Sequence, residues 1–166
     1  MTRQLLSITA LLFGSAFLLF AGGIHSILLP VRGGAEGFSA LSLGLLGTGW
    51  AIGYVAGCVT MAGVVARVGH IRAFAVMAAF AAVSILGAPL AVDPVPWIVL
   101  RALSGFCFAG AAMIVESWLS ERSAAETRGR VFGAYTMVNL VASTAGQLIL
   151  PLGDPMGFAF FVIAGM

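Results

Sequence analysis

Residues 97–119 read WIVLRALSGFCFAGAAMIVESWL, a stretch in which Arg101 and Glu116 carry the only charges. A helix that crosses a bilayer needs about 20 predominantly apolar residues. A strand of a membrane barrel would instead alternate apolar and polar residues over about ten positions. Because this stretch is continuously apolar and about twice that length, it predicts a transmembrane helix.

The composition of the whole chain agrees with a membrane protein. Hydrophobic residues make up 61% of the 166 residues, and charged residues make up 8%, against about 25% in soluble domains. This excludes a soluble enzyme and a disordered chain. All eight basic residues are Arg, and the net charge of +2 is too small to mark a nucleic-acid-binding face. We expect the lipid bilayer as a partner and no nucleic acid.

Further apolar runs lie on both sides of this stretch, separated by short polar breaks. They predict an all-α polytopic membrane protein with five transmembrane helices plus part of a sixth. The expected spans are 5–29, 41–66, 73–92, 97–119 and 131–152, with a partial span at 157–166. The first span should stop at Pro30, and the segment 32–39 should be a flexible outer loop. We expect one incomplete transmembrane bundle over residues 1–166.

The distribution of arginines predicts the orientation of the helices in the membrane. Cytoplasmic segments are enriched in Lys and Arg. With the N-terminus inside, only Arg32 and Arg101 fall on the outer side. The other six fall on the inner side: Arg3, Arg67, Arg72, Arg122, Arg128 and Arg130. The sequence therefore predicts a cytoplasmic N-terminus.

Three glycines in the second span form a GxxxGxxxG pattern: Gly49, Gly53 and Gly57. A spacing of four places them on one helix face, where small residues let another backbone approach closely. One interpretation is ordinary helix packing. The other is a smooth surface on which two halves of a larger protein slide, and it predicts that these glycines meet helices outside the chain.

Arg101 lies within the fourth span, where a charged side chain is costly and marks a functional site by default. One interpretation is that it reaches back to the outer interface beside Trp97. The other is that it faces a cavity, where it binds an anionic group or takes part in proton coupling. Ser104 and Phe108 follow it on the same helix face.

Polar residues form a stripe along the fifth span, each four positions after the last: Tyr135, Asn139, Ser143 and Gln147. Polar groups in a membrane face the bundle interior or a water-filled cavity. The stripe therefore either forms hydrogen bonds between helices or lines a solute path. The first span has a thinner stripe of Ser15, Gly22 and Ser26, with His25 beside it. A single His there is more often a packing residue than a proton carrier.

Signatures of catalysis are absent from the sequence. It contains no HExxH, GxSxG or Walker A motif. Cys58 and Cys107 lie inside apolar runs, away from any cluster with metal-ligand spacing. We expect no enzyme activity, no metal and no cofactor, which leaves transport as the leading function.

The loop 67–72, with the sequence RVGHIR, resembles a signature of the major facilitator superfamily, G-x-L-A-D-R-x-G-R-K. Arg67 and Gly69 match the first Arg and the second Gly, whereas Ala66 stands in place of the Asp. The fourth span resembles the R-x-x-x-G pattern of that family at Arg101 and Gly105. Residues 67–150 as a whole are similar to the YcaD-like branch of permeases in this superfamily.

The resemblance implies twelve helices in two halves that rock around a central site, in a bacterial cytoplasmic membrane. The chain then corresponds to the N-terminal half of a secondary transporter, cut short in its sixth helix, with the C-terminal half missing. A small solute, with or without proton coupling, would be the cargo. The substrate path or coupling residues would be Arg101, Asn139, Gln147, Tyr135 and His25. We expect that the 166 residues alone do not transport.

The inner face carries a group of charged residues that could take part in gating: Arg67, Gly69, Arg72, Glu116, Arg128 and Arg130. Glu116 lies too far along its helix to reach Arg101 and should pair with an inner-face arginine. The resemblance places this helix near the loop 67–72, so Arg67 is the expected partner. Either a structural clamp or a conformational switch fits this pair.

A second functional hypothesis is a non-transporting membrane protein. A truncated permease fold could serve as an assembly partner of other membrane proteins. A full-length reading frame downstream of residue 166 would favour the transporter, whereas stable expression of the 166-residue product without a C-terminal half would favour the assembly role.

Overall fold

The computed structural model describes the backbone of residues 2–166 and the side chains from Leu12 onward, so the expectation for Arg3 lies outside the described side chains. All the regular elements in this range are helices: α1 (Thr2–Ala35), α2 (Ala40–Val68), α3 (His70–Gly87), α4 (Pro94–Arg122), α5 (Arg128–Ile149) and α6 (Ala159–Gly165), with 3-10 turns at Ala88–Leu90 and Leu150–Leu152.

Four segments of these helices are long and apolar enough to cross a membrane: Leu12–Ala35, Ala40–Val68, His70–Leu90 and Pro94–Arg122. The chain is thus a helical membrane protein by length and composition. The polar residues of α5 make this helix less apolar, so α5 is not one of these four segments. The helix α6 has only seven residues.

The first helix is longer than expected, because it continues through Pro30 to Ala35. The expected stop at Pro30 is wrong. Proline removes one backbone hydrogen bond, but neighbouring groups in a membrane bundle satisfy the freed carbonyl. The turn is therefore confined to the residues after Ala35. Gly37 has a positive φ of 82° there, and Arg32 lies inside the helix rather than in a loop.

Polar groups and one glycine mark the other helix ends. The Ser39 hydroxyl accepts a hydrogen bond from the Ser42 N–H at 3.1 Å at the start of α2. The Asp93 carboxylate accepts one from the Val95 N–H at 2.9 Å at the start of α4. These side chains satisfy backbone donors that have no partner inside the helix. Between α2 and α3, Gly69 makes the turn with a φ of 81°.

Two helix pairs form the most extensive contacts, α2 with α4 and α1 with α5. Glycines make both approaches possible. A side-chain carbon at Gly53 would overlap the backbone oxygen of Ala102, and one at Gly105 would overlap that of Trp50. On the other pair, Gly23 meets the backbone of Ser143 in the same way. Within these pairs, backbone packs directly on backbone.

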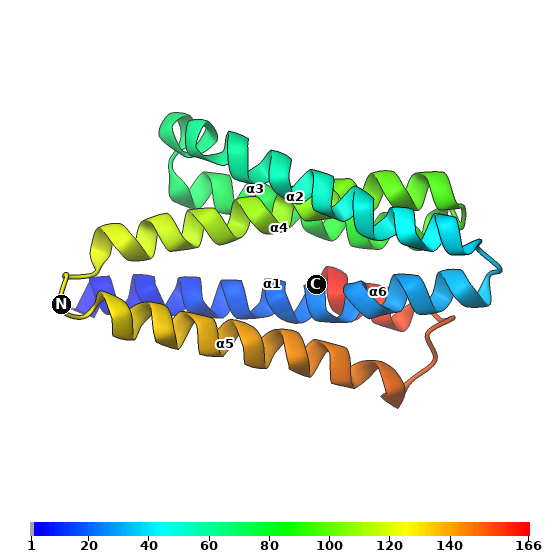
Figure 1. Cartoon of the computed structure of the whole chain (residues 1–166). Coiled ribbons are helices and arrows are strands. Elements are labelled where there is room, and N and C mark those ends of the chain that lie inside the picture. The colour runs from blue at the N-terminus through cyan, green and yellow to red at the C-terminus, as the bar shows by residue number, and fades with distance from the viewer. Residues whose placement is uncertain (1) are drawn as a thin grey trace.

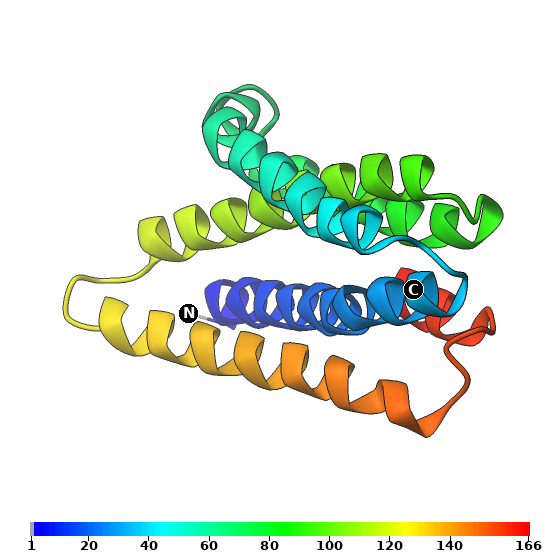
Figure 2. The ribbon, with the colours of Figure 1, turned by 45° about the vertical axis from the view of Figure 1, so that its right-hand side comes forward.

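The helices divide into two groups that have the same pattern of contacts. Helix α4 packs on α2 and α3, and α1 packs on α5 and α6. The α2, α3 and α4 group lies on one side of α1, and α5 lies alongside α1 on the other, in both views (Figures 1 and 2). Exchange of α1 with α4, α2 with α5 and α3 with α6 preserves these contacts. The correspondence is partial, because α2 contacts α3 to an extent that α5 and α6 do not match.

The glycine pattern of α2 faces α4 of this chain. Gly49, Gly53 and Gly57 are all buried, opposite the backbone oxygens of Ile98, Ala102 and Phe106. The expectation that these three glycines meet helices outside the chain is therefore wrong. The residue spacing specifies a close-packing face and contains no information about which helix occupies it.

The bundle core contains a tryptophan that we expected at the membrane interface. Trp97 is fully buried, and its indole N–H donates a hydrogen bond to the Ala88 carbonyl at 2.8 Å. Its ring packs against Phe38, with centroids 5.0 Å apart. Trp97 thus links the turn before α4 to the α1–α2 turn.

We predict that Gly53→Ala destabilises the bundle, whereas Gly47→Ala on the same helix does not. The new methyl group at residue 53 would clash with the Ala102 carbonyl, but nothing lies within 4 Å of the corresponding position at Gly47. Overpacking costs about 1–3 kcal/mol, and alanine in a helix otherwise gains about 1 kcal/mol over glycine. Thermal unfolding in detergent should separate the two variants. Equal stability would contradict the close approach.

Candidate functional site

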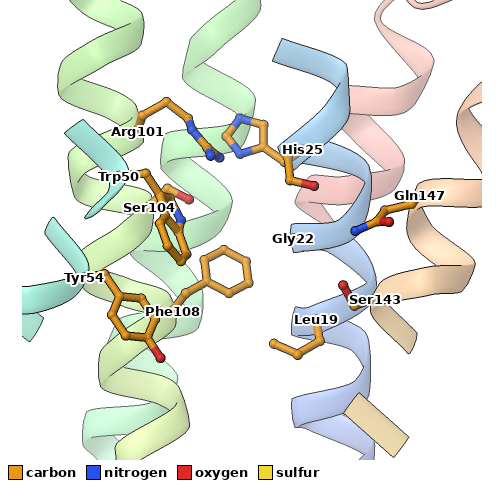
Figure 3. Close-up of a pocket in the computed structure, with 11 residues that line it drawn as sticks. Leu19, Gly22, His25, Trp50, Tyr54, Arg101, Ser104, Phe108, Ser143 and Gln147 are labelled. Carbon is orange, nitrogen blue, oxygen red and sulfur yellow. The ribbon is translucent and has the colours of Figure 1, made fainter. Parts of the chain in front are cut away.

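A cavity of about 400 Å³ lies between the two helix groups and is lined by α1, α2, α4 and α5. From α1 it receives Leu19, Gly22, His25 and Ser26. From α5 it receives Ser143 and Gln147. Figure 3 shows His25 at one end of the cavity and Leu19 towards the other. Gly22, His25 and Ser26 of the first span therefore face this cavity, whereas Ser15 does not line it.

The opposite wall comes from α2 and α4. Trp50 and Tyr54 lie one turn apart on α2, and Arg101, Ser104 and Phe108 follow one another on α4. Arg101 and His25 lie at one end of the cavity, and Tyr54 and Phe108 lie towards the other, where Ser143 adds a polar group (Figure 3). A volume of about 300–1,000 Å³ is typical of small-molecule sites.

Arg101 points into this cavity from α4, with its guanidinium directed towards His25 (Figure 3). Its Cζ lies 6.0 Å from the centroid of the Trp50 ring. Its Nε is buried and has no hydrogen-bond partner. Among the described side chains, the only ion pairs are Arg32–Glu36 and His70–Glu121, so no carboxylate balances Arg101. The geometry favours the cavity interpretation over an interface anchor.

Two other side chains at this end of the cavity also lack partners. His25 is fully buried, and neither ring nitrogen makes a hydrogen bond. The hydroxyl of Ser104, also fully buried, has no partner. Buried polar groups are normally hydrogen-bonded. Their free donors and acceptors therefore mark a place where a ligand or water is expected to bind.

The polar stripe of α5 divides into two parts. Ser143 and Gln147 line the cavity, but Asn139 accepts a hydrogen bond from the Ser15 hydroxyl at 2.8 Å. Tyr135 is buried beside Val115 and Leu119. The residues drift around the helix by about 40° per step, so one end of the stripe faces the cavity and the other faces the contacts with α1 and α4.

Glu116 does not form the expected ion pair with Arg67. Glu116 is exposed on α4, and the described ion pairs do not include it. The carboxylate that does contact the α2–α3 connection is Glu121, whose Oε1 lies 3.6 Å from the Nε2 of His70. Five residues separate the two acids, or about 140° around a helix. They therefore face in different directions.

The other residues expected at the inner face lie around the helix ends. Arg67 and Arg72 are exposed on either side of Gly69, and Arg130 is exposed in α5. The Arg128 guanidinium donates a hydrogen bond to the Ser120 carbonyl at 3.2 Å across the α4–α5 connection. The structure thus places these residues at helix ends near one another, and connects only Arg128 to the preceding helix.

Sequence reasoning missed the aromatic wall of the cavity. Trp50 and Tyr54 each follow a glycine of the α2 packing face, Gly49 and Gly53. A residue next to a packing position lies about 100° around the helix, at the edge of the contact with α4. That offset is the signal that could have placed them beside Arg101. Among the described residues, no group of three His, Cys, Asp or Glu side chains could hold a metal ion.

The chain is similar to proteins that are named as transporters. The chain is 27% identical over 140 residues to proteins named "Uncharacterized MFS-type transporter YcaD" from Escherichia coli O45:K1 (strain S88 / ExPEC) and O81 (strain ED1a), and equally to that of O139:H28 (strain E24377A / ETEC). MFS denotes the major facilitator superfamily. The match covers 84% of this chain and 37% of each relative.

The match indicates a distant relationship to transporters. The chain spans about 37% of the length of the curated relatives that it matches. No protein-family model and no solved structure matches it. The fold and the cavity must therefore support any more specific function.

We predict that the hydrogen bond between Ser15 and Asn139 couples α1 to α5. A double-mutant cycle of Ser15→Ala and Asn139→Leu should give a coupling energy of about 0.6 kcal/mol, the average for such bonds within membranes. The measurement is unfolding in mixed micelles. Thr60, whose hydroxyl donates only to the Ala56 carbonyl of its own helix, offers a control, because Thr60→Ala and Ser15→Ala should be additive. Additive effects of Ser15→Ala and Asn139→Leu would contradict the contact.

Proposed function

We propose that this chain is part of a secondary transporter of the major facilitator type, in which the cavity between its two helix groups binds a small solute. The observation that carries the proposal is the cavity itself. A cluster of unpartnered polar groups lies in the interior of an apolar helical bundle. Burying such groups without hydrogen-bond partners costs free energy. A solute path would explain why the bundle contains them.

A mechanism of alternating access requires a second set of helices, which would form the other wall of the solute path. In transporters built from repeats, the solute site lies at the interface of two bundles that rock against each other. The two helix groups of this chain, related by the exchange of α1 with α4, would together make one such bundle. We propose that residues 1–166 belong to the N-terminal bundle, with α5 as a fifth span and α6 as part of a sixth.

Within this bundle the cavity residues would have different tasks. Arg101, His25 and Gln147 would contact the solute or take part in coupling to protons, because they line the cavity. Tyr135 and Asn139 lie beyond it and would hold the path together by packing and hydrogen bonding.

The residues at the inner helix ends would control movement of the bundle. His70 and Glu121 connect the α2–α3 turn to α4 at 3.6 Å, and Arg128 joins α5 to the end of α4. Arg67, Gly69 and Arg72 lie at the same turn, where a second bundle could contact them. Glu116 is exposed on α4. Together these residues would form the gating network.

The orientation that we propose has the N-terminus in the cytoplasm of a bacterial cell. The α2–α3 and α4–α5 connections lie at the same end of the bundle as the N-terminus (Figure 1). The flanking arginines of these connections, among them Arg67 and Arg128, therefore share one membrane surface. The opposite end has Arg32, which pairs with Glu36 at 3.4 Å. This asymmetry is typical of cytoplasmic loops.

We predict that the complete product of the gene encoding this chain catalyses solute uptake. Purified product in proteoliposomes should accumulate a member of a panel of labelled organic anions, amines and sugars when a pH gradient or membrane potential is imposed. The 166 residues alone should show no uptake, because the path needs walls from both bundles.

The control is the same preparation without an imposed gradient. If the complete product binds none of the panel and moves none, while it copurifies with another membrane protein, the assembly role replaces transport. Uptake by the 166 residues alone would contradict the need for a second bundle.

The orientation can be measured by cysteine labelling. In a chain whose Cys58 and Cys107 are replaced by serine, Gly34→Cys should react with an impermeant maleimide in intact cells, because it lies at the outer end of α1 in open space. Ala125→Cys, exposed in the α4–α5 connection, should react only after the membrane is opened. The reverse pattern would place the N-terminus outside.

A further inference from the structure

We propose that the solute is a small organic monoanion, whose carboxylate binds Arg101, His25 and Ser104 and whose apolar body lies against the aromatic rings of the same cavity. This inference rests on the proposed function, because it specifies the solute class for the proposed site. The solute would thus have one negative charge, a carboxylate headgroup beside Arg101 and an apolar body beside the aromatic rings.

No carboxylate balances the charge of Arg101 among the described residues. Its guanidinium lies inside an apolar bundle. An ion in a low-dielectric interior is costly unless an opposite charge lies beside it. The Trp50 ring, 6.0 Å away, supplies only a weak cation–π contact. The bound solute would supply the missing negative charge.

Hydrogen-bond donors without protein partners lie at the same end of the cavity as that charge. A neutral imidazole has one N–H in either tautomer, so His25 offers a donor to the cavity. The Ser104 hydroxyl offers another, and Arg101 offers the planar fork that fits a carboxylate. Neither His25 nor Ser104 has a protein partner. In Figure 3 the side chains of His25 and Arg101 converge from opposite walls.

Beyond Arg101, the walls from α2 and α4 are mainly aromatic, whereas α5 contributes the polar residues Ser143 and Gln147. Trp50, Tyr54, Phe108 and Leu19 lie beyond Arg101 on the way towards the other end (Figure 3). The rings of Trp50 and Tyr54 are 4.9 Å apart and tilted by 33°. A flat or branched hydrocarbon body can pack against these faces, and a solute the size of benzoate fits a volume of about 400 Å³.

The number of charges in the cavity selects a monoanion. Among the described residues that line the cavity, only Arg101 has a permanent charge. A second carboxylate on the solute would lie among aromatic rings without a cation, and an unpaired buried charge costs far more than an apolar group of the same size. A neutral amide of the same shape would leave Arg101 unbalanced. Both analogues should therefore bind more weakly than the monoanion.

The test is binding of benzoate to the purified chain in detergent, measured by isothermal titration calorimetry, with benzamide and phthalate as the neutral and dianionic analogues. We expect saturable benzoate binding at least tenfold tighter than that of either analogue. Arg101→Gln should weaken benzoate binding at least tenfold. Arg101→Lys, which keeps the charge but loses the fork, should weaken it by a smaller factor.

The matched control is Arg122→Gln. It removes the same charge from the same helix, but Arg122 lies at the far end of α4, stacked over Trp118 at 4.8 Å. Benzoate binding should stay within twofold of the unmodified chain. His25→Leu and Ser104→Ala should each weaken binding about three- to tenfold. Elution as a single symmetric peak shows that each variant is folded, and Arg101→Lys tests the site even if Arg101→Gln does not fold.

Three outcomes would overturn the proposal: no saturable benzoate binding by the folded chain, equal binding of benzoate and benzamide, or benzoate binding that Arg101→Gln and Arg101→Lys leave unchanged. Failure of transport is a separate result. Uptake of amines or sugars by the complete product, without benzoate binding, would overturn the monoanion and leave transport standing. Arg101-dependent benzoate binding without uptake of any solute would support the anion site and remove transport.

Discussion

Direct contact between helix backbones at glycine is the constraint on which the rest of this structure depends. Gly53 and Gly105 allow α2 to approach α4, and Gly23 and Gly146 allow α1 to approach α5. In a membrane the hydrophobic effect does not drive helices together, so association relies on such close van der Waals contact. A single methyl group at any of these positions would separate a pair.

The close approach within each pair leaves the cavity between the pairs. Because glycine faces of α2 and α4 are used against each other, their larger residues, such as Trp50 and Phe108, lie at the edge of that contact and reach the cavity. Arg101, on α4, likewise reaches the cavity. Packing thus collects the polar and aromatic side chains of four helices in one place, and the proposed solute site follows from that arrangement.

Much of this could be predicted from the sequence, but not all of it. The pattern of apolar runs predicted the positions of the helices along the chain to within a few residues at most ends, because a helix must have a minimum apolar length to cross the bilayer. It misplaced the end of α1, because a proline that ends a helix in water does not need to end one among membrane helices. The pairing of Glu116 with Arg67 was wrong for another reason. Helix ends that are neighbours can still have their charged side chains on different faces.

The sequence by itself determined that this is a helical membrane protein. It also predicted that most arginines lie on one side of the membrane, and that burying Arg101 in a membrane helix costs free energy. These follow from length, composition and local periodicity, which each residue carries whatever its neighbours in space. Only the tertiary structure decided that the glycines of α2 meet α4 and that His25 on α1 lies opposite Arg101. Both depend on which helix faces meet, and residues that are far apart in the chain decide that by their shapes.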